Sequence, residues 1–409
     1  MDTLPKLLFV SDVPIEETSS GSLHLYRLLR NYPSDRLRVA ESSYASSGSN
    51  QEDRLPGVRY TTFSFGNSRW SRSRLRRWHG SLLHLSARWR EHAEIERIVE
   101  AWTPDAILTL WHGYSWLHAA NTARSHNLPL HLIVHDDIPN YKGRAHPLFD
   151  KLYHRDFRRV YRQAAFRLCV SPYMEETYRE RYGASGTVMY PMRNWGAPQY
   201  DAPPDKVRES ISNFVVAYSG SLHTMGFREM LHDVAEIVEE LGGHLLVFSH
   251  IDPESARGEH WVRPSMDLRS FVPQEKIIPT LRQEADALFL PMAFKGKPRV
   301  LSRTNYPSKL AEYTATGLPL LVWGPEETSG VRWARSNPGG AEVVTSPESD
   351  AVRPALQRLV NDPDHRFRIG KKALEIGEEY FAPEVAWSTF YEAISQKSNI
   401  EKPSTLREV

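Results

Sequence analysis

Short apolar runs separated by longer helical patterns recur along this sequence in two successive arrays. Continuous runs of Val, Ile and Leu are typical of parallel strands that are covered on both faces, whereas strands with one wet face alternate apolar and polar residues. Strands that alternate with helices predict a parallel sheet flanked by helices. We therefore predict one doubly wound α/β domain in the first half of the chain. Its expected strands fall at 7–10, 38–40, 106–110, 130–135 and 166–170.

The pattern restarts after a segment rich in Pro and Asp at 198–205. A helix with apolar residues at 3.6-residue spacing follows the first strand of this second array. The two arrays predict two similar domains, residues 1–200 and 201–380, with a cleft between them. We expect the ligand site in this cleft, because such folds bind ligands beyond the carboxyl ends of their parallel strands. A final helix at 384–394 and a polar, disordered tail at 397–409 complete the predicted organisation. The strands expected in the second array fall at 214–218, 244–249, 287–291, 318–323 and 342–344.

The composition limits the class of protein. The 409 residues suit two or three domains. With 51 basic and 50 acidic residues the net charge is +1, so no attraction of the whole chain to nucleic acid is predicted. Cys169 is the one cysteine and cannot form an internal disulfide, so nothing indicates an oxidising compartment. The N-terminus lacks the pattern of a signal peptide, and no run approaches the roughly 20 apolar residues of a membrane span. We therefore expect a cytoplasmic protein that can still contact a membrane surface.

The segment 306–323 carries the clearest binding signal. Ser308 suits the N-cap of a short helix that begins at Lys309 and ends before Gly317, and a strand follows. The free N–H groups at a helix N-terminus favour a phosphate, and Ser308 and Lys309 add a hydroxyl and an ammonium there. Glu312, one turn further on, can present its carboxylate to vicinal hydroxyls such as those of a ribose. The alternative is structural: Ser308 only caps the helix and Glu312 only complements its dipole.

This segment resembles the donor-site helix of retaining glycosyltransferases of the GT-B fold, in particular those of family four. Ser219 to Leu222 is similar to the first turn of the family's C-terminal domain, and 271–291 to its stretch that holds the nucleotide base. The resemblance covers 214–394, about half of the chain, and agreement at several places counts for more than one motif. The helix residues that carry it are Pro307, Ser308, Lys309, Leu310, Glu312, Tyr313, Ala315, Gly317 and Pro319.

The resemblance implies a GT-B fold of two Rossmann-like domains that face each other, with the helix around Trp387, within 381–396, crossing back to the N-terminal domain. It implies an enzyme that transfers a hexosyl or related group from a nucleotide-diphosphate sugar, with retention of configuration and without a metal. The nucleotide sugar is a co-substrate, and no cofactor is expected. The acceptor is a glycan, a lipid-linked sugar or a protein, as in polysaccharide biosynthesis. Donor contacts are expected from Gly21, Ser219, Gly220, His223, Val272, Thr304, Asn305, Tyr306, Ser308 and Glu312.

Two departures from the family pattern concern the donor site. Thr304 stands eight positions before Glu312, where the family often has a glutamate that contacts the donor sugar. His223 and Met225-Gly226 stand where relatives often carry an Arg and a Lys that neutralise the diphosphate. The positive charge must therefore come from other residues.

We assign that charge to Lys309 and Arg303, which with His135 are the expected catalytic residues. Arg303 belongs to a predicted loop at 294–305 that is rich in basic residues and can equally be a solvated surface loop. The loop holds three further candidates, namely Lys295, Lys297 and Arg299.

In the N-terminal half, His135 stands at the carboxyl end of an expected strand. The resemblance implies that it contacts the donor sugar, whereas by itself a histidine at a strand end is ordinary. The neighbouring Asp136 and Asp137 do not predict a metal site, because adjacent side chains on a strand point to opposite faces and no second cluster of ligands is recognisable. Gly21 opens a helix after the first strand, where a glycine permits close approach of a ligand.

The segment 69–90 holds seven arginines and three tryptophans, Trp70, Trp78 and Trp89. A basic helix with Trp and Leu can lie on an anionic membrane surface. It can also bind an anionic acceptor or a partner protein, or be a solvated helix packed on its domain. These interpretations stay open at this point.

The expected function is transfer of a sugar, with electrostatic stabilisation of the leaving diphosphate as the main chemical demand. Two alternatives share the fold: a nucleotide-sugar epimerase, which needs no acceptor, and a non-catalytic nucleotide-sugar-binding partner of another transferase. The absence of the first glutamate keeps the second alternative open. No pair of carboxylates is recognisable by spacing as that of a glycoside hydrolase.

Overall fold

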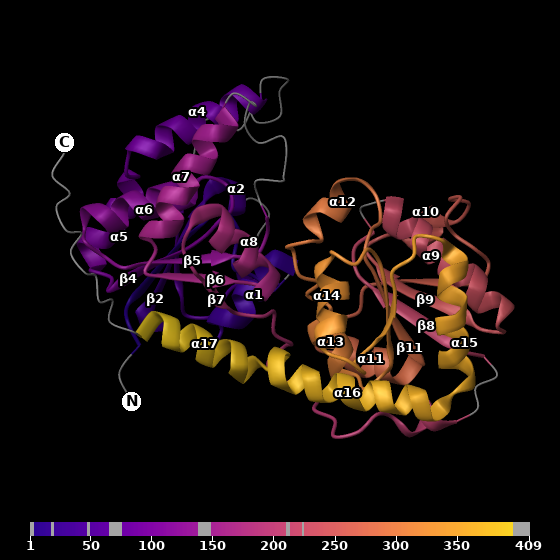
Figure 1. Cartoon of the computed structure of the whole chain (residues 1–409). Coiled ribbons are helices and arrows are strands. Elements are labelled where there is room, and N and C mark those ends of the chain that lie inside the picture. Colours follow the sequence, from indigo (N-terminus) through magenta and orange to yellow (C-terminus); the bar gives the residue numbers. More distant parts are fainter. Residues whose placement is uncertain are drawn as a thin grey trace. The chain divides into compact units, whose positions relative to one another are not determined.

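The computed structural model describes residues 4–17, 20–46, 50–64, 76–137, 149–209, 213–222 and 225–395. The chain divides into two compact units (Figure 1). The N-terminal unit comprises Met1–Met189 and Trp387–Val409, and the C-terminal unit comprises Tyr190–Ala386. Each unit is a parallel sheet with helices on both faces (Figure 1). The predicted fold class, two doubly wound α/β domains, is confirmed.

The sheet of the N-terminal unit has seven strands in the order β3-β2-β1-β4-β5-β6-β7. All of its neighbouring strands pair in parallel. The central strands are buried along their whole length, as their continuous apolar sequences require. The strands are β1 (Leu7–Ser11), β2 (Leu37–Ser42), β3 (Arg59–Phe63), β4 (Ala106–Leu110), β5 (Leu130–Val134), β6 (Phe166–Cys169) and β7 (Thr187–Val188).

Helices connect these strands, and local residues set several of the helix ends. Ser171 caps α8 by accepting a hydrogen bond from the Met174 N–H, Pro172 occupies the first turn, and Gly183 ends the helix in the left-handed conformation. The helices of this unit are α1 (Ser20–Leu29), α2 (Ser43–Ser46), α4 (Arg76–Trp89), α5 (Ala93–Trp102), α6 (Ser115–Ser125), α7 (Asp150–Gln163) and α8 (Pro172–Tyr182), with short 3-10 turns at Ser34–Arg36 and Gln51–Asp53.

The sheet of the C-terminal unit has six parallel strands in the order β10-β9-β8-β11-β12-β13. They are β8 (Val215–Ser219), β9 (His244–Ser249), β10 (Met266–Ser270), β11 (Ala287–Pro291), β12 (Leu320–Trp323) and β13 (Glu342–Val344). The helices are α9 (Met225–Glu240), α10 (Pro253–Ala256), α11 (Ile277–Glu284), α12 (Gly296–Leu301), α13 (Leu310–Ala315), α14 (Ser329–Ser336), α15 (Arg353–Asn361) and α16 (Pro363–Phe381), with 3-10 turns at Asp205–Arg208 and Ser349–Val352. The last helix, α17 (Pro383–Ser395), belongs to the N-terminal unit from Trp387 onwards.

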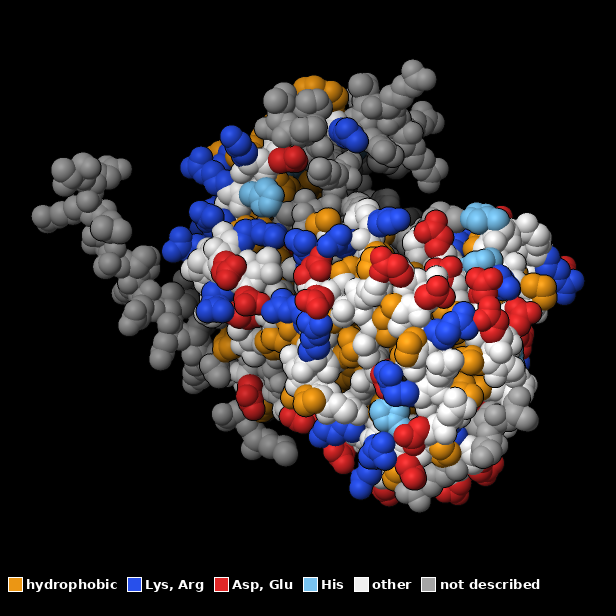
Figure 2. Space-filling view, turned by 45° about the vertical axis from the view of Figure 1, so that its right-hand side comes forward, with side chains coloured by type: hydrophobic (Ala, Val, Ile, Leu, Met, Phe, Trp, Pro, Cys, Tyr) orange, Lys and Arg blue, Asp and Glu red, His pale blue; other side chains and the backbone are white. Residues whose placement is uncertain are grey.

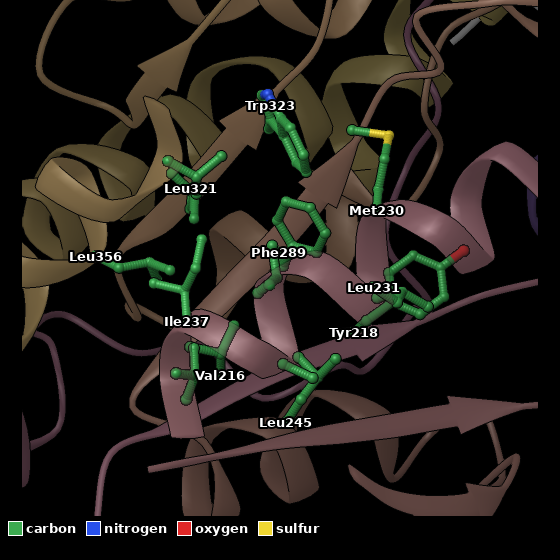
Figure 3. Packing of buried hydrophobic residues seen from close by; sticks show 14 of the residues in the cluster. Val216, Tyr218, Met230, Leu231, Ile237, Leu245, Phe289, Leu321, Trp323 and Leu356 are labelled. Carbon is green, nitrogen blue, oxygen red and sulfur yellow. The ribbon is translucent and has the colours of Figure 1, made fainter. Parts of the chain in front are cut away.

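A hydrophobic core fills the space between α9 and one face of the sheet of the C-terminal unit (Figure 3). Phe289 of β11 and Trp323 of β12 lie with ring centroids 6.4 Å apart. The apolar face of α9 packs beside them through Leu231 and Ile237, which are buried (Figure 3). Burial of such side chains is the main favourable term in folding, at about 25 cal/mol per Å² of apolar area. This core fixes the strand ends that form the site described below.

The sequence patterns miss three strands, each of which lies at an edge of its sheet. The edge strand β3 is partly exposed, with polar residues among its five positions. The edge strand β10 exposes Arg269 and Ser270, and β7 has only two residues. Strands at an edge need not be apolar, because one side of them meets solvent. Among the described residues, no helix combines the length and apolar character needed to cross a membrane.

Candidate functional site

The order of the strands marks one place in the C-terminal unit as the expected ligand site. From β8 the chain winds through β9 to β10 on one side of the sheet, and from β11 through β12 to β13 on the other. Open α/β sheets bind ligands outside the carboxyl ends of the strands where the order reverses. Ser219 and Gly220 stand at this position, at the end of β8. The structure therefore puts two of the predicted donor residues at the switch point of the sheet.

Lys309 lies directly against this strand end. Its Nζ is 4.0 Å from the centroid of the Tyr218 ring. A Cβ on Gly220 would lie 2.5 Å from that Nζ and 2.9 Å from the Tyr218 hydroxyl oxygen. Gly220 is thus a position where a side chain would displace the ammonium, which is the close approach that favours glycine. Lys309, just before α13, and Gly220, just after β8, thus lie together although about ninety positions separate them in the sequence.

The ammonium of Lys309 is only partly solvated. Burial lowers the pKa of Lys309 to about 7, and the nearby carboxylate of Glu312 opposes this shift. The face of the Tyr218 ring offers the cation a weak electrostatic partner. A phosphate would supply the full counter-charge that the free site provides only in part. The arrangement suits a dianionic ligand that arrives from solvent.

Tyr313 ties α13 to the same strand end. Its hydroxyl accepts a hydrogen bond from the Ser219 N–H at 2.7 Å and donates one to the Ser219 carbonyl at 3.3 Å. Tyr313 is buried, and burial raises its pKa well above the usual range, so the hydroxyl stays neutral. We call Ser219, Gly220, Lys309, Glu312 and Tyr313 the β8–α13 cluster.

The start of α13 differs from the prediction. The helix begins at Leu310 with Lys309 at the N-cap, and no side chain caps it. Ser308 is exposed and lies before the cap, so the expected Ser308 cap is wrong. The end of the helix is as expected, with Gly317 at φ 69° after Thr316 and β12 directly following.

The predicted loop at 294–305 contains a helix, α12, instead of an irregular loop throughout. Arg299 and Arg303 are both exposed and share one partner, the carboxylate of Glu327, at 2.7 and 3.3 Å. Glu327 thereby neutralises part of the charge that we assigned to the donor diphosphate. Lys295 is exposed before α12, and the side chain of Lys297 lies outside the described residues.

The next three predicted donor residues are engaged in packing. Thr304 is buried, and its hydroxyl donates to the Leu301 carbonyl at 3.4 Å. Tyr306 is buried against Tyr190, with ring centroids 5.5 Å apart. The carbonyl of Asn305 accepts a hydrogen bond from the Ser329 hydroxyl. The buried side chains of Thr304 and Tyr306 therefore hold in place the segment that leads into α13.

Val272 follows the edge strand β10 and is half-buried. The preceding Phe271 is 47% exposed, and its ring centroid lies 6.5 Å from that of His250, which follows β9. Phe271 belongs to the stretch 271–291 that resembles the family's nucleotide-base segment, whereas the neighbouring His250 was not singled out by the sequence patterns. His223, another predicted donor residue, lies outside the described residues.

In the N-terminal unit, Gly21 and His135 lie side by side. A Cβ on Gly21 would be 4.0 Å from the ring of His135, whose Nε2 is 3.4 Å from the Asp136 carboxylate. His24 of α1 is close by, and its pKa is lowered to about 3. The main cause is burial of the ring, and the second is the charge of the neighbouring His135. Two residues far apart in sequence, both predicted to contact the donor, are thus brought together within this unit.

The acidic residues near His135 have structural partners. Asp137 is buried and accepts hydrogen bonds from Tyr178 at 3.1 Å and Arg181 at 2.9 Å. Asp12, after β1, accepts from the N–H groups of Tyr114 and Ser115 at the start of α6. The described part of the chain contains no group of three or more His, Cys, Asp or Glu side chains arranged to hold a metal ion.

Comparisons with known proteins agree with this architecture. A model of Glycosyltransferase Family 4 matches residues 22–192. HepE of Anabaena in complex with UDP is similar in structure, with a TM-score of 0.67 and 14% identity over 95% of this chain and 99% of that one. Sucrose-phosphate synthase of Thermosynechococcus elongatus has a TM-score of 0.62 and 14% identity over 94% of this chain and 97% of that one.

A third similar structure is a Listeria monocytogenes protein assigned as a UDP-N-acetylglucosamine 2-epimerase, with a TM-score of 0.58 and 12% identity over 95% of each chain. No curated protein sequence matches the chain. At these identities the structural matches establish the GT-B fold. With the family match they place the chain among enzymes of the glycosyltransferase type.

Proposed function

We propose that the chain moves a sugar from a nucleotide-diphosphate sugar to an acceptor, and that the β8–α13 cluster binds the donor. The observation that carries this proposal is the contact of Lys309 with Gly220 at the switch point of the C-terminal sheet. A cation held against a glycine turn there suits a diphosphate, because the glycine lets the ligand reach both the backbone and the ammonium.

The main chemical task of this site is to stabilise charge on the leaving diphosphate as the glycosidic bond breaks. Lys309 carries out this task from a position where water only partly screens it. Glu312 accepts hydrogen bonds from the ribose hydroxyls. Arg303 contributes after exchanging Glu327 for the diphosphate, because the two are paired in the free protein.

Five finer assignments belong to the same proposal. The nucleotide is UDP in the first instance, since the similar HepE structures hold UDP and UDP-glucose. His135, beside Gly21, contacts the sugar. The reaction retains the anomeric configuration and needs no metal. The acceptor is a glycan, a lipid-linked sugar or a protein.

An epimerase is the alternative with a specific observation behind it, the similarity to the Listeria protein assigned as a 2-epimerase. The two reactions differ in what they consume. A transferase releases free nucleotide only when an acceptor is present, whereas an epimerase changes the sugar without any acceptor. Incubation with a panel of nucleotide sugars, with and without cell extract, separates them by the products formed. Binding without turnover in either condition identifies a non-catalytic binding module.

The donor site itself is tested by Glu312→Ala and calorimetry with UDP. Loss of charge-assisted hydrogen bonds to the ribose is expected to weaken binding about 10- to 100-fold. The matched control is Glu375→Ala, which removes an exposed carboxylate of α16 that lies 3.1 Å from Lys372. Equal affinities of both variants and the wild type, for every nucleotide of the panel that binds, refute the assignment.

A further inference from the structure

Helix α4 exposes an apolar stripe to solvent. Trp78, Leu82 and Trp89 are 46%, 61% and 74% exposed. They lie four and seven positions apart, which at 3.6 residues per turn puts them on one side of the helix, and Leu85 falls between them on the same side. Among the described residues these are three of the six large hydrophobic side chains that are exposed. We call Trp78, Leu82, Leu85 and Trp89 the α4 stripe.

The opposite face of α4 is fixed to the N-terminal unit, so the direction of the stripe is defined. His84 is buried, and its Nε2 lies 2.8 Å from the buried carboxylate of Asp156 in α7. Arg88 donates to the same carboxylate at 2.9 Å. The Asn121 side chain of α6 donates to the Ala87 carbonyl at 3.0 Å. Trp78 also meets the ring of Phe149 edge-on, with centroids 6.4 Å apart, and still exposes nearly half of its surface. The anchored helix therefore presents contiguous apolar area to solvent, which is typical of an interaction surface.

The charge next to the stripe is mainly positive, although the exposed Glu91 directly follows Arg90. The sequence from Arg54 to Arg90 contains no acidic residue. Arg77 and Arg90 are exposed at the two ends of α4. The Arg88 guanidinium lies 4.6 Å from the centroid of the Trp89 ring. Figure 2 shows acidic and basic side chains interspersed over much of the visible surface, whereas the upper left is mainly basic.

We propose that the α4 stripe is a docking surface for an anionic phospholipid bilayer, with the helix lying in the plane of the membrane interface. Tryptophan favours the boundary between headgroups and acyl chains, and leucine enters the apolar region. Arginines at both ends bind lipid phosphates, and each adds to the attraction of an anionic surface.

A second copy of the chain fits this surface less well. A symmetric dimer through α4 would place the stripe and its arginines opposite themselves, so like charges would meet with no acidic residue of this segment to balance them. A bilayer that contains anionic lipid complements both the apolar stripe and the charge. The proposal does not depend on the β8–α13 cluster, which lies in the C-terminal unit. It adds a membrane surface as the place where the enzyme would meet its acceptor.

The test uses the full chain and sedimentation with two kinds of vesicles, phosphatidylcholine alone and phosphatidylcholine mixed with phosphatidylglycerol. We expect binding to the anionic vesicles that falls as salt is added. The double variant L82S/W89S is expected to bind them at least about tenfold more weakly. R77E/R90E is expected to lose about tenfold or more on anionic vesicles with no loss on neutral ones.

The matched control is Val385→Ser on α17, which is 37% exposed and lies away from α4 in sequence. It is expected to bind vesicles like the wild type. All variants change exposed side chains, so thermal denaturation and UDP affinity should be unchanged, and these readouts separate failure of this proposal from failure of the donor site. The proposal is overturned if the wild type prefers neither vesicle, if L82S/W89S binds like the wild type, or if the wild type is a dimer that L82S/W89S converts to monomers.

Discussion

Protonation of Lys309 should control the affinity of the chain for its donor. Burial lowers the pKa of Lys309 in the free protein to about 7, against 10.5 for a solvated lysine. A diphosphate that contacts the ammonium returns this pKa toward its ordinary range, since an opposite charge favours the charged form. Donor binding is therefore coupled to the uptake of a proton. We expect affinity for a nucleotide sugar to fall as the pH rises through about 7.

The magnitude follows from the fraction of free protein that is already charged. With a pKa of about 7, roughly nine-tenths of Lys309 is protonated at about pH 6 and roughly one-tenth at about pH 8. Only the charged form has its full attraction for the diphosphate, so the dissociation constant should rise about tenfold between these pH values. This corresponds to about 1.4 kcal/mol of binding free energy. A nucleotide sugar has no titrating phosphate proton in this range, so it is a better probe than the free nucleotide.

The same shift has a defined sign for stability. The folded pKa of Lys309 lies below its unfolded value of 10.5, so the unfolded chain binds more protons between about pH 7 and 10.5. This group therefore opposes folding most below about pH 7, and its penalty is relieved as the pH rises toward 10.5. Bound donor removes part of the penalty. The gain in melting temperature on adding donor should thus be larger at about pH 6 than at about pH 8.

Calorimetry in two buffers with different heats of ionisation measures the coupled proton directly. At about pH 8 we expect uptake of nearly one proton for each donor bound. Lys309→Arg keeps a charge at every accessible pH and should abolish the uptake, whatever its affinity. Lys309→Met should bind weakly and independently of pH. Wild-type affinity that is flat between about pH 6 and pH 8, or the same proton uptake in Lys309→Arg, would refute the reasoning.

Two further predictions concern the scaffold of the site. Tyr313→Phe leaves the Ser219 N–H without its acceptor, so we expect a loss of about 1–3 kcal/mol in urea unfolding together with weaker donor binding. Gly317→Ala forces a side chain into the left-handed region at φ 69° and brings its Cβ within about 3 Å of three neighbours, whereas Gly258, at φ 92°, has nothing within 4 Å of its Cβ position. Gly258→Ala should therefore lower the free energy of unfolding by about 1 kcal/mol and Gly317→Ala by clearly more, and equal losses would contradict the packing argument.

Much of the fold could be predicted because a buried parallel strand has a recognisable sequence pattern, a continuous apolar run. The inner strands at 106–110, 244–249 and 287–291 have the predicted bounds in the structure. Both faces of such strands must be apolar, so the sequence shows a continuous run whatever the surroundings. The edge strand β10 lacks this pattern, because Arg269 and Ser270 are exposed to solvent. Its strand conformation is stabilised by pairing with β9, which the sequence of β10 alone does not indicate.

A helix boundary could be predicted where the backbone requires one residue type. It could not be predicted where several residue types can occupy the position. Gly317 must follow α13 because its φ is positive, and the sequence indicates this end of the helix. At the other end, Ser308 is a common cap residue, but the chain enters the helix one position later and leaves the serine in solvent. The helix α12 was missed because its short basic sequence also suits a loop.

The residues of the candidate site were predictable one at a time, but their partners were not. The motif around α13 names Lys309, Glu312 and Tyr313. Nothing in it indicates that the Tyr313 hydroxyl holds both backbone groups of Ser219, or that Glu327 pairs with Arg303. Such contacts depend on which strand ends meet, and this is decided by the strand order across the whole unit.

The structure changes the physical account of how an anion would be held at α13. A helix of six residues with no side-chain cap offers few aligned peptide dipoles, so its N-terminus contributes little to binding. The charge must then come mainly from Lys309, whose proton is exchangeable at neutral pH. A helix dipole would attract a diphosphate equally at any pH, whereas this lysine attracts it fully only when protonated, so above about pH 7 binding requires the uptake of a proton. On the proposed donor assignment, we therefore expect the pH dependence of donor affinity to follow the protonation of Lys309.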